Sequence, residues 1–185
     1  YDIRNSLVKK QPFAGVKVDL KKCFDTVRPS QAIAVWEQWG VDPKISGILR
    51  AFYAQQVRWI EWQSVVSFPP VKPKRGLIQG CPASPLLLAG LMTIWTKHVI
   101  HNAPNVHLAV YLDDRTIWSH GPSGHNNIQV ALDKGAEIDT SFCLEEHPAK
   151  REVFANNMKR ARLMRHMVTE DKKCGTHFDL LGVNY

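Results

Sequence analysis

Hydrophobic and polar residues alternate in several short stretches, which predicts β-strands. Residues 13–20 alternate apolar with small or polar residues and predict a strand that ends at Asp19. Two apolar runs at 107–111 and 115–118 flank Asp113 and Asp114, which predicts a β-hairpin over 106–119 with the acids at its tip. Further short strands are predicted at 57–62, with a hairpin partner at 64–68, and at 153–154, 161–168 and 178–185.

Helical spacing of apolar residues, together with start and stop signals, predicts four helices. The predicted helices cover 31–39 with Ser30 as N-cap, 43–56 with Asp42 as N-cap and Pro43 first, 86–100, and 126–142. The segment 86–100 is apolar on almost every side, which indicates a buried helix. Residues 69–76 hold three prolines and a glycine and predict irregular structure.

This order of elements predicts the fold class. When the helices and hairpin inserted at 30–68 are set aside, the order is β-α-β-β-α-β. That order predicts an α+β fold built on a split βαβ (ferredoxin- or RRM-like) antiparallel sheet, with helices on one face. In such a sheet the first and third strands are neighbours, so Asp19 should lie beside the Asp113–Asp114 hairpin.

Composition restricts the partners. The chain has 185 residues, of which 44% are hydrophobic and 22% charged, which suits one globular domain. Its formal net charge is +7, and a distributed positive field favours a polyanion, with nucleic acid preferred over a membrane. We expect no apolar run to be long enough to span a bilayer, so no membrane partner is predicted.

The four cysteines do not form a recognisable metal-binding pattern. Cys143 with His147 and Cys174 with His177 have irregular spacing for a zinc site. Reduced thiols in an intracellular protein are the preferred interpretation, without a choice between nucleus and cytoplasm.

The three carboxylates are the candidate chemistry. Asp19, Asp113 and Asp114 could meet at one edge of the sheet, where they would repel one another unless cations neutralise them. Two Mg²⁺ ions about 3.5–4 Å apart, or Mn²⁺ in their place, would do so and would support in-line phosphoryl transfer. The alternative is that the Asp-Asp pair only serves the turn, where aspartate is common.

Three stretches, taken in order, resemble motifs A, B and C of reverse transcriptases of the non-LTR retroelement, group II intron and retron type. They are Val18 to Asp25, Arg75 to Pro85, and Tyr111 to Asp114. Residues 144–150 resemble motif D, and residues 178–183 resemble the primer-grip motif E. The resemblance covers about residues 13 to 185.

This resemblance implies an RNA-directed DNA polymerase that extends a DNA primer on an RNA template with dNTPs, using two metal ions. Asp19 and Asp113 would bind both metals, Asp114 would support them, and the Leu20 carbonyl would be a further ligand beside the nucleotide. Lys150 would lie near the triphosphate as a charge partner or proton donor. The alternative for Lys150 is a solvated surface lysine.

The same resemblance implies a nucleotide pocket and a primer grip. Phe24 would act as the bulky gate against a 2′-hydroxyl, with plain core packing as its alternative. Gln79 and Gly80 would line the pocket, and Leu181 with Gly182 would support the primer end. One departure is Leu112, since the family commonly has a small residue before the two aspartates.

The resemblance also implies that the chain, residues 1–185, is a palm with a partial fingers insertion at about 30–75. The N-terminal fingers and the C-terminal thumb are expected to be absent, so activity is expected to need the rest of the parent polypeptide rather than this fragment alone. Two other functions stay open. One is an RNA-dependent RNA polymerase, and the other is an RNA-binding scaffold without catalysis.

Overall fold

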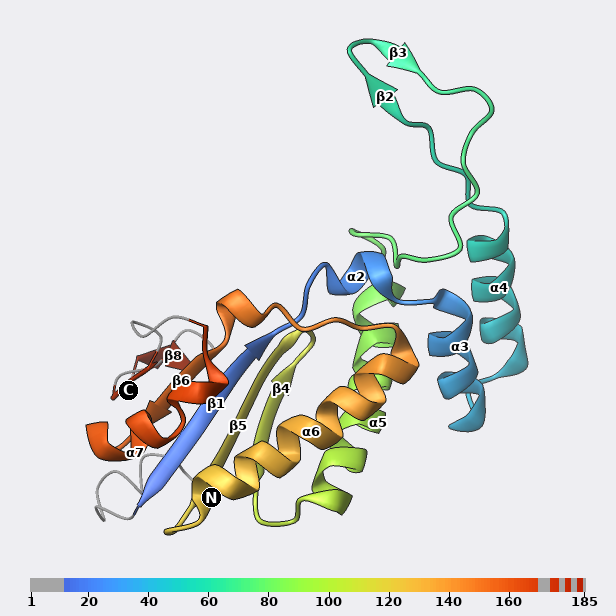
Figure 1. Ribbon diagram of the computed structural model, residues 1–185. Coiled ribbons are helices and arrows are strands. Elements are labelled where there is room, and N and C mark those ends of the chain that lie inside the picture. Colours follow the sequence, from blue (N-terminus) through green and yellow to red (C-terminus); the bar gives the residue numbers. More distant parts are fainter. Residues whose placement is uncertain (1–11, 170–173, 177–178, 181–182, 185) are drawn as a thin grey trace. The chain divides into compact units, whose positions relative to one another are not determined.

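The computed structural model describes residues 12–169, 174–176, 179–180 and 183–184 (Figure 1). The chain divides into two compact units. One unit combines Tyr1–Lys21 with Met92–Tyr185, and the other is Lys22–Leu91. The chain passes from the second unit back into the first inside helix α5 (Ala83–Asn102).

A five-stranded sheet in the order β4-β5-β1-β6-β7 forms the centre of the first unit. Its strands are β1 (Phe13–Asp19), β4 (His107–Tyr111), β5 (Asp114–His120), β6 (Glu152–Ala155) and β7 (Cys174–Gly175). The pairs β4–β5, β5–β1 and β1–β6 are antiparallel, which confirms the predicted split βαβ order. The edge strand β7 pairs in parallel with β6, so the sheet is mixed rather than purely antiparallel.

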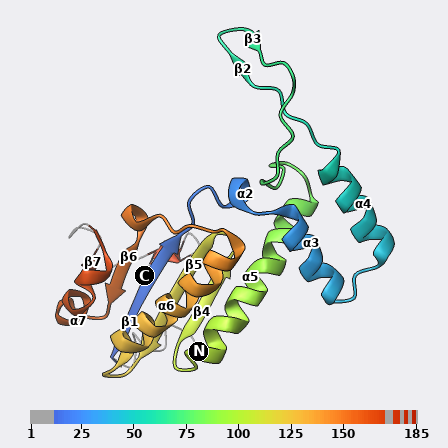
Figure 2. The same cartoon turned by 45° about the vertical axis from the view of Figure 1, so that its right-hand side comes forward.

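Helices cover one face of this sheet. Figure 2 shows α6 (Gly124–Phe142) lying across the strands with α5 beside it. Alternate β1 residues Ala14, Val16 and Val18 define the helix face, and they join one core cluster with α5, α6 and α7 (Met158–Leu163). The helices contribute Trp95, Val99, Ile128, Ala131 and Ala161 to that cluster, and Met164, which caps the end of α7, joins them. This burial of a period-2 stripe under amphipathic helices is what the sequence pattern predicts.

The other β1 residues define the opposite face, which we call the Asp19 face: Phe13, Gly15, Lys17 and Asp19. A small aromatic cluster of Phe13, Trp118 and Phe154 lies on it. Gly15 makes room for this cluster, because a Cβ built at Gly15 would lie 2.2 Å from the Phe154 ring. The strand therefore needs glycine here for close packing rather than for a special backbone angle.

Gly15→Ala is expected to destabilise the protein by about 1–3 kcal/mol, because the Phe154 ring must leave its place. Gly47→Ala in α4 (Pro43–Ala54) is the matched control, since a Cβ there meets nothing within 4 Å. That variant should gain about 0.5–1 kcal/mol from helix propensity. Urea unfolding of the two variants measures both changes, and equal midpoints would contradict the packing argument.

Two histidines lie beside the aromatic cluster of the Asp19 face. His107 stacks on Trp118 with ring centroids 5.6 Å apart, and His120 lies 5.2 Å from His107. Burial lowers the pKa of His107, and burial followed by repulsion from His107 lowers the pKa of His120. Both side chains therefore favour the neutral form in the folded protein.

The stability of the protein should consequently fall as the pH drops below about 6.5, the ordinary pKa of histidine. Below that pH the unfolded chain binds protons that the folded state resists, and above it both states are neutral and the effect vanishes. Urea unfolding between pH 5 and 8 measures this slope. His120→Phe, which keeps a ring against Phe13, should reduce the slope. An unchanged slope in this variant would show that other groups cause it.

The second unit, residues 22–91, carries helices α2 (Cys23–Thr26), α3 (Pro29–Gln38) and α4. The predicted cap of α4 is confirmed, because Asp42 Oδ1 accepts a hydrogen bond of 2.7 Å from the Lys44 amide. Helix α3 begins at Pro29, so Ser30 is its second residue and the prediction of Ser30 as N-cap is wrong.

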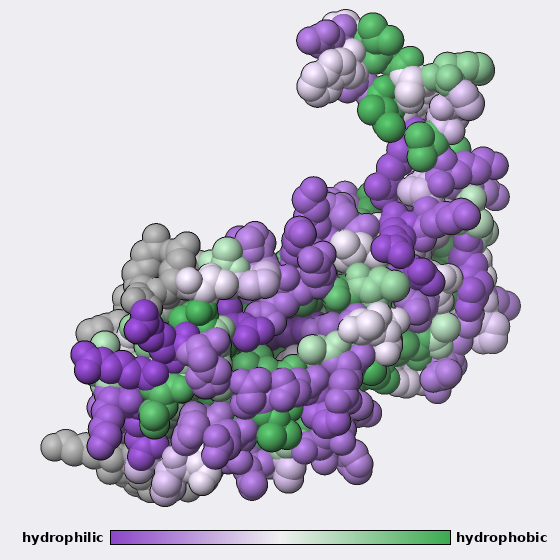
Figure 3. All heavy atoms as spheres, viewed as in Figure 1, coloured by the Kyte–Doolittle hydropathy of each residue, from purple (hydrophilic) through white to green (hydrophobic). Residues whose placement is uncertain are grey.

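The predicted strands at 57–62 and 64–68 form a much shorter hairpin, β2 (Glu61–Trp62) and β3 (Val65–Val66). Figure 3 shows apolar side chains gathered on this hairpin. Its exposed apolar residues include Trp59, Ile60, Trp62, Val65, Val66 and Phe68. Regular pairing covers two residues on each strand, and beyond it an isolated bridge joins Arg58 to Val71.

Two predictions near the C-terminus are wrong. Residues 161–168 form the second half of α7 and the short 3-10 helix η2 (Arg165–Met167) instead of a strand. Ala161, Met164 and Met167 recur every third residue and are all buried, so a helix serves them better than a strand. Within the predicted strand at 178–185, the described residues form two short antiparallel strands, β8 (Asp179–Leu180) and β9 (Val183–Asn184).

The expectation that no apolar run is long enough to span a bilayer is wrong for helix α5. Its 20 residues are long and apolar enough to cross a membrane by length and composition alone. A core helix passes the same test, and the α5 side chains Leu87, Leu88, Leu91 and Trp95 are buried.

Candidate active site

The predicted acids lie at the ends of adjacent strands. Asp19 is the last residue of β1 and is directly paired with Asp114, the first residue of β5. Asp114 is also paired with Tyr111 of β4, so Leu112 and Asp113 form a two-residue turn. Leu112 has a φ of 54°, a left-handed conformation that tight hairpin turns require. The sheet thereby brings the backbone of all three acids to one edge.

Alternation along the strands decides which way these acids face. Val18 and Arg115, which are directly paired, are buried on the helix face. Their neighbours Asp19 and Asp114 therefore lie on the opposite, Asp19 face, and both are half-buried. Two like charges directly opposite each other on antiparallel strands are destabilising, so this pair requires a cation nearby.

Lys150 supplies that cation in the structure. Its Nζ lies 3.0 Å from Asp19 Oδ2, although the two residues are 131 positions apart. Among the described residues no three His, Cys, Asp or Glu side chains are close enough together to hold a metal ion. The three carboxylates are thus neighbours along the backbone but are not gathered as ligands, and the ammonium group stands beside the first of them.

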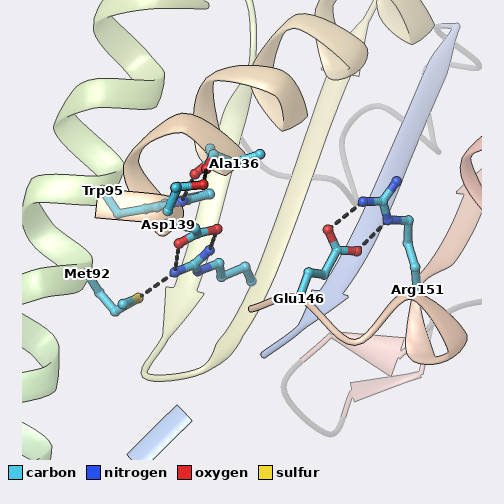
Figure 4. A network of polar contacts seen from close by, with 9 residues as sticks. Met92, Trp95, Ala136, Asp139, Glu146 and Arg151 are labelled. Carbon is cyan, nitrogen blue, oxygen red and sulfur yellow. Dashed lines mark hydrogen bonds and ion pairs between the residues drawn. The ribbon is translucent and has the colours of Figure 1, made fainter. Parts of the chain in front are cut away.

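The segment before Lys150 is fastened to the end of β1. The Lys21 amide donates to the Glu145 carbonyl at 2.7 Å, and the His147 amide donates to the Asp19 carbonyl at 2.8 Å. An ion pair between Glu146 and Arg151 holds the following turn (Figure 4). The 3-10 helix η1 (Pro148–Lys150) ends this turn at Lys150. The sequence predicted a role for Lys150 near a triphosphate, but no pattern indicated its contact with Asp19.

The donor set fits a hard divalent cation. Carboxylate oxygens are the ligands that Mg²⁺ and Mn²⁺ prefer, and here three carboxylates share one sheet edge. Asp19, Asp113 and Asp114 are the residues that would hold such an ion. Leu20 is buried and bridges to Glu146, so its backbone is fixed beside them.

The predicted nucleotide-pocket residues belong to the second unit. Phe24 lies in α2 and is half-buried, and its carbonyl accepts a hydrogen bond of 2.7 Å from the Leu77 amide. The Gly76 amide donates a hydrogen bond of 2.8 Å to the Val27 carbonyl. The start of the motif B stretch therefore runs along the short helix that carries Phe24.

Gln79 and Gly80 are exposed in the turn that precedes α5. Gly80 has a φ of +86°, which L side chains rarely adopt, so glycine is required here for the backbone. Buried Ser84 fixes this turn, because its hydroxyl donates to the Ile78 carbonyl at 2.7 Å and lies 3.2 Å from the Tyr53 hydroxyl. Sequence reasoning missed the contact between Ser84 and Tyr53. The one available signal was the position of Ser84 in the motif B stretch. Leu181 and Gly182 lie outside the described residues.

Sequence reasoning also missed a buried charge network behind the acids (Figure 4). Arg115 follows Asp114 and is 1% exposed. Its guanidinium donates to both carboxylate oxygens of Asp139 at 2.7 and 2.8 Å and lies 4.2 Å from the centre of the Trp95 ring. The available signal was a charged residue two positions before Ile117, where strand alternation puts both side chains on the same face.

Comparison with known protein families gives a match over almost the whole chain. The family model described as reverse transcriptase (RNA-dependent DNA polymerase) matches residues 4–182. A comparison with curated protein sequences finds no match.

Among solved structures, apo telomerase from Candida tropicalis, truncated from its C-terminal domain, is 13% identical with a TM-score of 0.67. The match covers 98% of this chain and 36% of that one. Telomerase from Candida albicans, in complex with a fragment of telomeric RNA, is 13% identical with a TM-score of 0.66, over 98% of this chain and 31% of that one.

At this identity the structural matches show the fold alone, and this chain spans about a third of the telomerase chains. The family model, in contrast, covers almost every residue. Together with the five-stranded palm-like sheet and the acids at its edge, this match shows that the chain belongs to the reverse transcriptase (RNA-dependent DNA polymerase) family.

Proposed function

We propose that this chain is the catalytic palm of a larger retroelement-type protein that synthesises DNA on an RNA template. The parent protein would be encoded by a retroelement of the non-LTR, group II intron or retron type. The single observation that carries the proposal is the pairing of Asp19 with Asp114 at the sheet edge, with Lys150 at 3.0 Å from Asp19. If Asp113 and Asp114 served only the geometry of the hairpin turn, Asp19 and Lys150 would have no reason to lie beside them.

The reaction class is nucleotidyl transfer to a primer 3′-hydroxyl. Two divalent ions, when bound at Asp19 and Asp113, would activate the hydroxyl and stabilise the charge that develops on the triphosphate. Asp114 supports this site from β5, where its backbone is held between two strands. Lys150, whose side chain is 57% exposed, can leave Asp19 and pair with the phosphates or give a proton to the pyrophosphate.

Residues of the second unit would select and hold the nucleotide. Phe24 is the proposed steric gate against a 2′-hydroxyl, and exposed Gly80 allows close approach of the substrate to the backbone. The net charge of +7 suits contacts with the phosphates of template and primer, which should make binding salt-dependent.

The test is primer extension by the full-length protein on an RNA template with Mg²⁺, comparing dNTPs with rNTPs. Extension with dNTPs is expected, with rNTPs incorporated at least about 100-fold less efficiently because Phe24 clashes with the 2′-hydroxyl. Phe24→Val should reduce this discrimination while dNTP incorporation persists.

The alternatives predict different results in the same assay. Preferred incorporation of rNTPs would indicate an RNA-dependent RNA polymerase. Salt-sensitive RNA binding without turnover in Mg²⁺ or Mn²⁺ would indicate an RNA-binding scaffold without catalysis.

A further inference from the structure

The buried Arg115–Asp139 pair lies directly behind the proposed active site and has no role in the chemistry described above. We propose that Arg115 is a positioning residue: its ion pair with Asp139 fixes the register of the Asp113–Asp114 hairpin and thus the direction of both acids. This inference rests on the proposed function, and it adds a determinant that the predicted motifs do not include.

The guanidinium is held from several sides. Two hydrogen bonds tie it to Asp139 of α6, one at 3.2 Å reaches the Met92 sulfur of α5, and the Trp95 ring lies 4.2 Å away. Trp95 is itself fixed, since its Nε1 donates to the Gly135 carbonyl at 3.2 Å. A Cβ at Gly135 would lie 2.9 Å from that ring, so glycine makes room for it. These contacts therefore hold the Arg115 side chain in a single position.

The connection to the acids is short. Arg115 is paired with Val18 on one side and Val110 on the other, one residue inward from the Asp19–Asp114 and Tyr111–Asp114 pairs. Only Leu112 and Asp113 separate the two hairpin strands. A turn this short cannot compensate for a shift of β5 relative to β4. Fixing Arg115 on the helix face consequently fixes Asp114 on the Asp19 face.

The alternative register explains why a charge pair is useful here. If β5 slipped by one residue, Asp114 would turn toward the helices, where Asp139 would repel it, and Arg115 would leave its partner. Because it would leave buried charges unpaired, the shifted register is disfavoured relative to the observed one by a factor of about a hundred or more. Ile117, two residues further on the same face, is apolar and fully buried, so burial alone does not require an arginine.

The test separates positioning from stability. An apolar pair of similar size can replace a buried ion pair with little loss of stability, so Arg115→Met combined with Asp139→Leu is the informative variant. In the full-length protein we expect a near-wild-type melting temperature and RNA affinity. We expect turnover at least about 10-fold lower with an unchanged KM for dNTP, and weaker Mn²⁺ binding measured by electron paramagnetic resonance.

The control is the bidentate pair of Arg50 with Glu37, which joins α4 and α3 within the second unit. Arg50→Met with Glu37→Leu should change neither turnover nor Mn²⁺ affinity. Should the double variant at positions 115 and 139 fail to fold, Arg115→Lys replaces it. The lysine keeps the charge but loses the planar fork and its stacking on Trp95.

Wild-type turnover and wild-type Mn²⁺ affinity in the variant that folds would overturn the proposal, because the pair would then be structural only. The Mn²⁺ measurement also separates this proposal from the proposed function. A wild-type protein that binds Mn²⁺ but does not extend primers overturns the polymerase proposal, and weaker Mn²⁺ binding by the variant still supports the positioning role. A wild-type protein that binds no Mn²⁺ overturns both.

Discussion

Replacing Asp113 with Asn in the full-length protein is expected to lower dNTP incorporation by about a thousandfold or more, with RNA binding and melting temperature unchanged. Asp113 lies in a two-residue turn between β4 and β5 and makes no strand pair, so its loss does not disturb the sheet. The amide keeps the shape of the side chain but removes a negative charge and a hard oxygen donor. Catalysis that depends on bound divalent ions should lose most of its transition-state stabilisation.

The same assay includes graded comparisons. Asp19→Asn should be as severe, whereas Asp114→Asn should be milder if Asp114 only supports the site. Asp133→Asn on the exposed side of α6 is the matched control for a lost carboxylate and should leave incorporation unchanged. Retained activity of the Asp113 variant would remove the metal assignment and leave the Asp-Asp pair as turn chemistry.

The placement of the acids could be predicted because it depends on local rules. Alternation over residues 13–19 and over the hairpin gives the strands, and the β-α-β-β-α-β order makes the first and third strands neighbours. The pairing of Asp19 with Asp114 follows from those two facts. Asp42 and Pro43 likewise mark the start of α4 by local chemistry alone.

The contacts that sequence reasoning missed join residues far apart in the chain. Lys150 reaches Asp19 only because the segment at 145–147 pairs with the end of β1. Arg115 meets Asp139 only because α6 lies across the sheet. No short-range pattern encodes either contact, since both depend on tertiary packing.

The misassigned stretch 161–168 shows a different limit. Its apolar residues fit both a strand and a short helix, and the length of such a run does not decide between them. Asn157 decides it in the structure, because its Oδ1 caps α7 by accepting from the Arg160 amide at 2.9 Å. A capping residue before a basic segment was the signal available in the sequence.

The Lys150–Asp19 ion pair has a consequence for metal binding. A cation already stands at the carboxylate that the proposed metal would need, so the ammonium and the metal compete for Asp19. The lysine must therefore leave Asp19 before the site can act, and the triphosphate provides the negative charge that would attract it. Its exposed side chain leaves it free to move in this way.

Lys150→Met is consequently expected to produce two effects of opposite sign in the full-length protein. Mn²⁺ affinity without dNTP should rise by up to about fivefold, the modest value of a largely exposed ion pair. Turnover should fall by about 100-fold, because the triphosphate loses its charge partner and the pyrophosphate loses its proton donor. Lys134→Met, which breaks an exposed ion pair with Glu137 on α6, is the control and should change neither quantity. Unchanged turnover in the Lys150 variant would identify Lys150 as a surface lysine, and a parallel fall of both quantities would show that it holds Asp19 in place rather than competing for it.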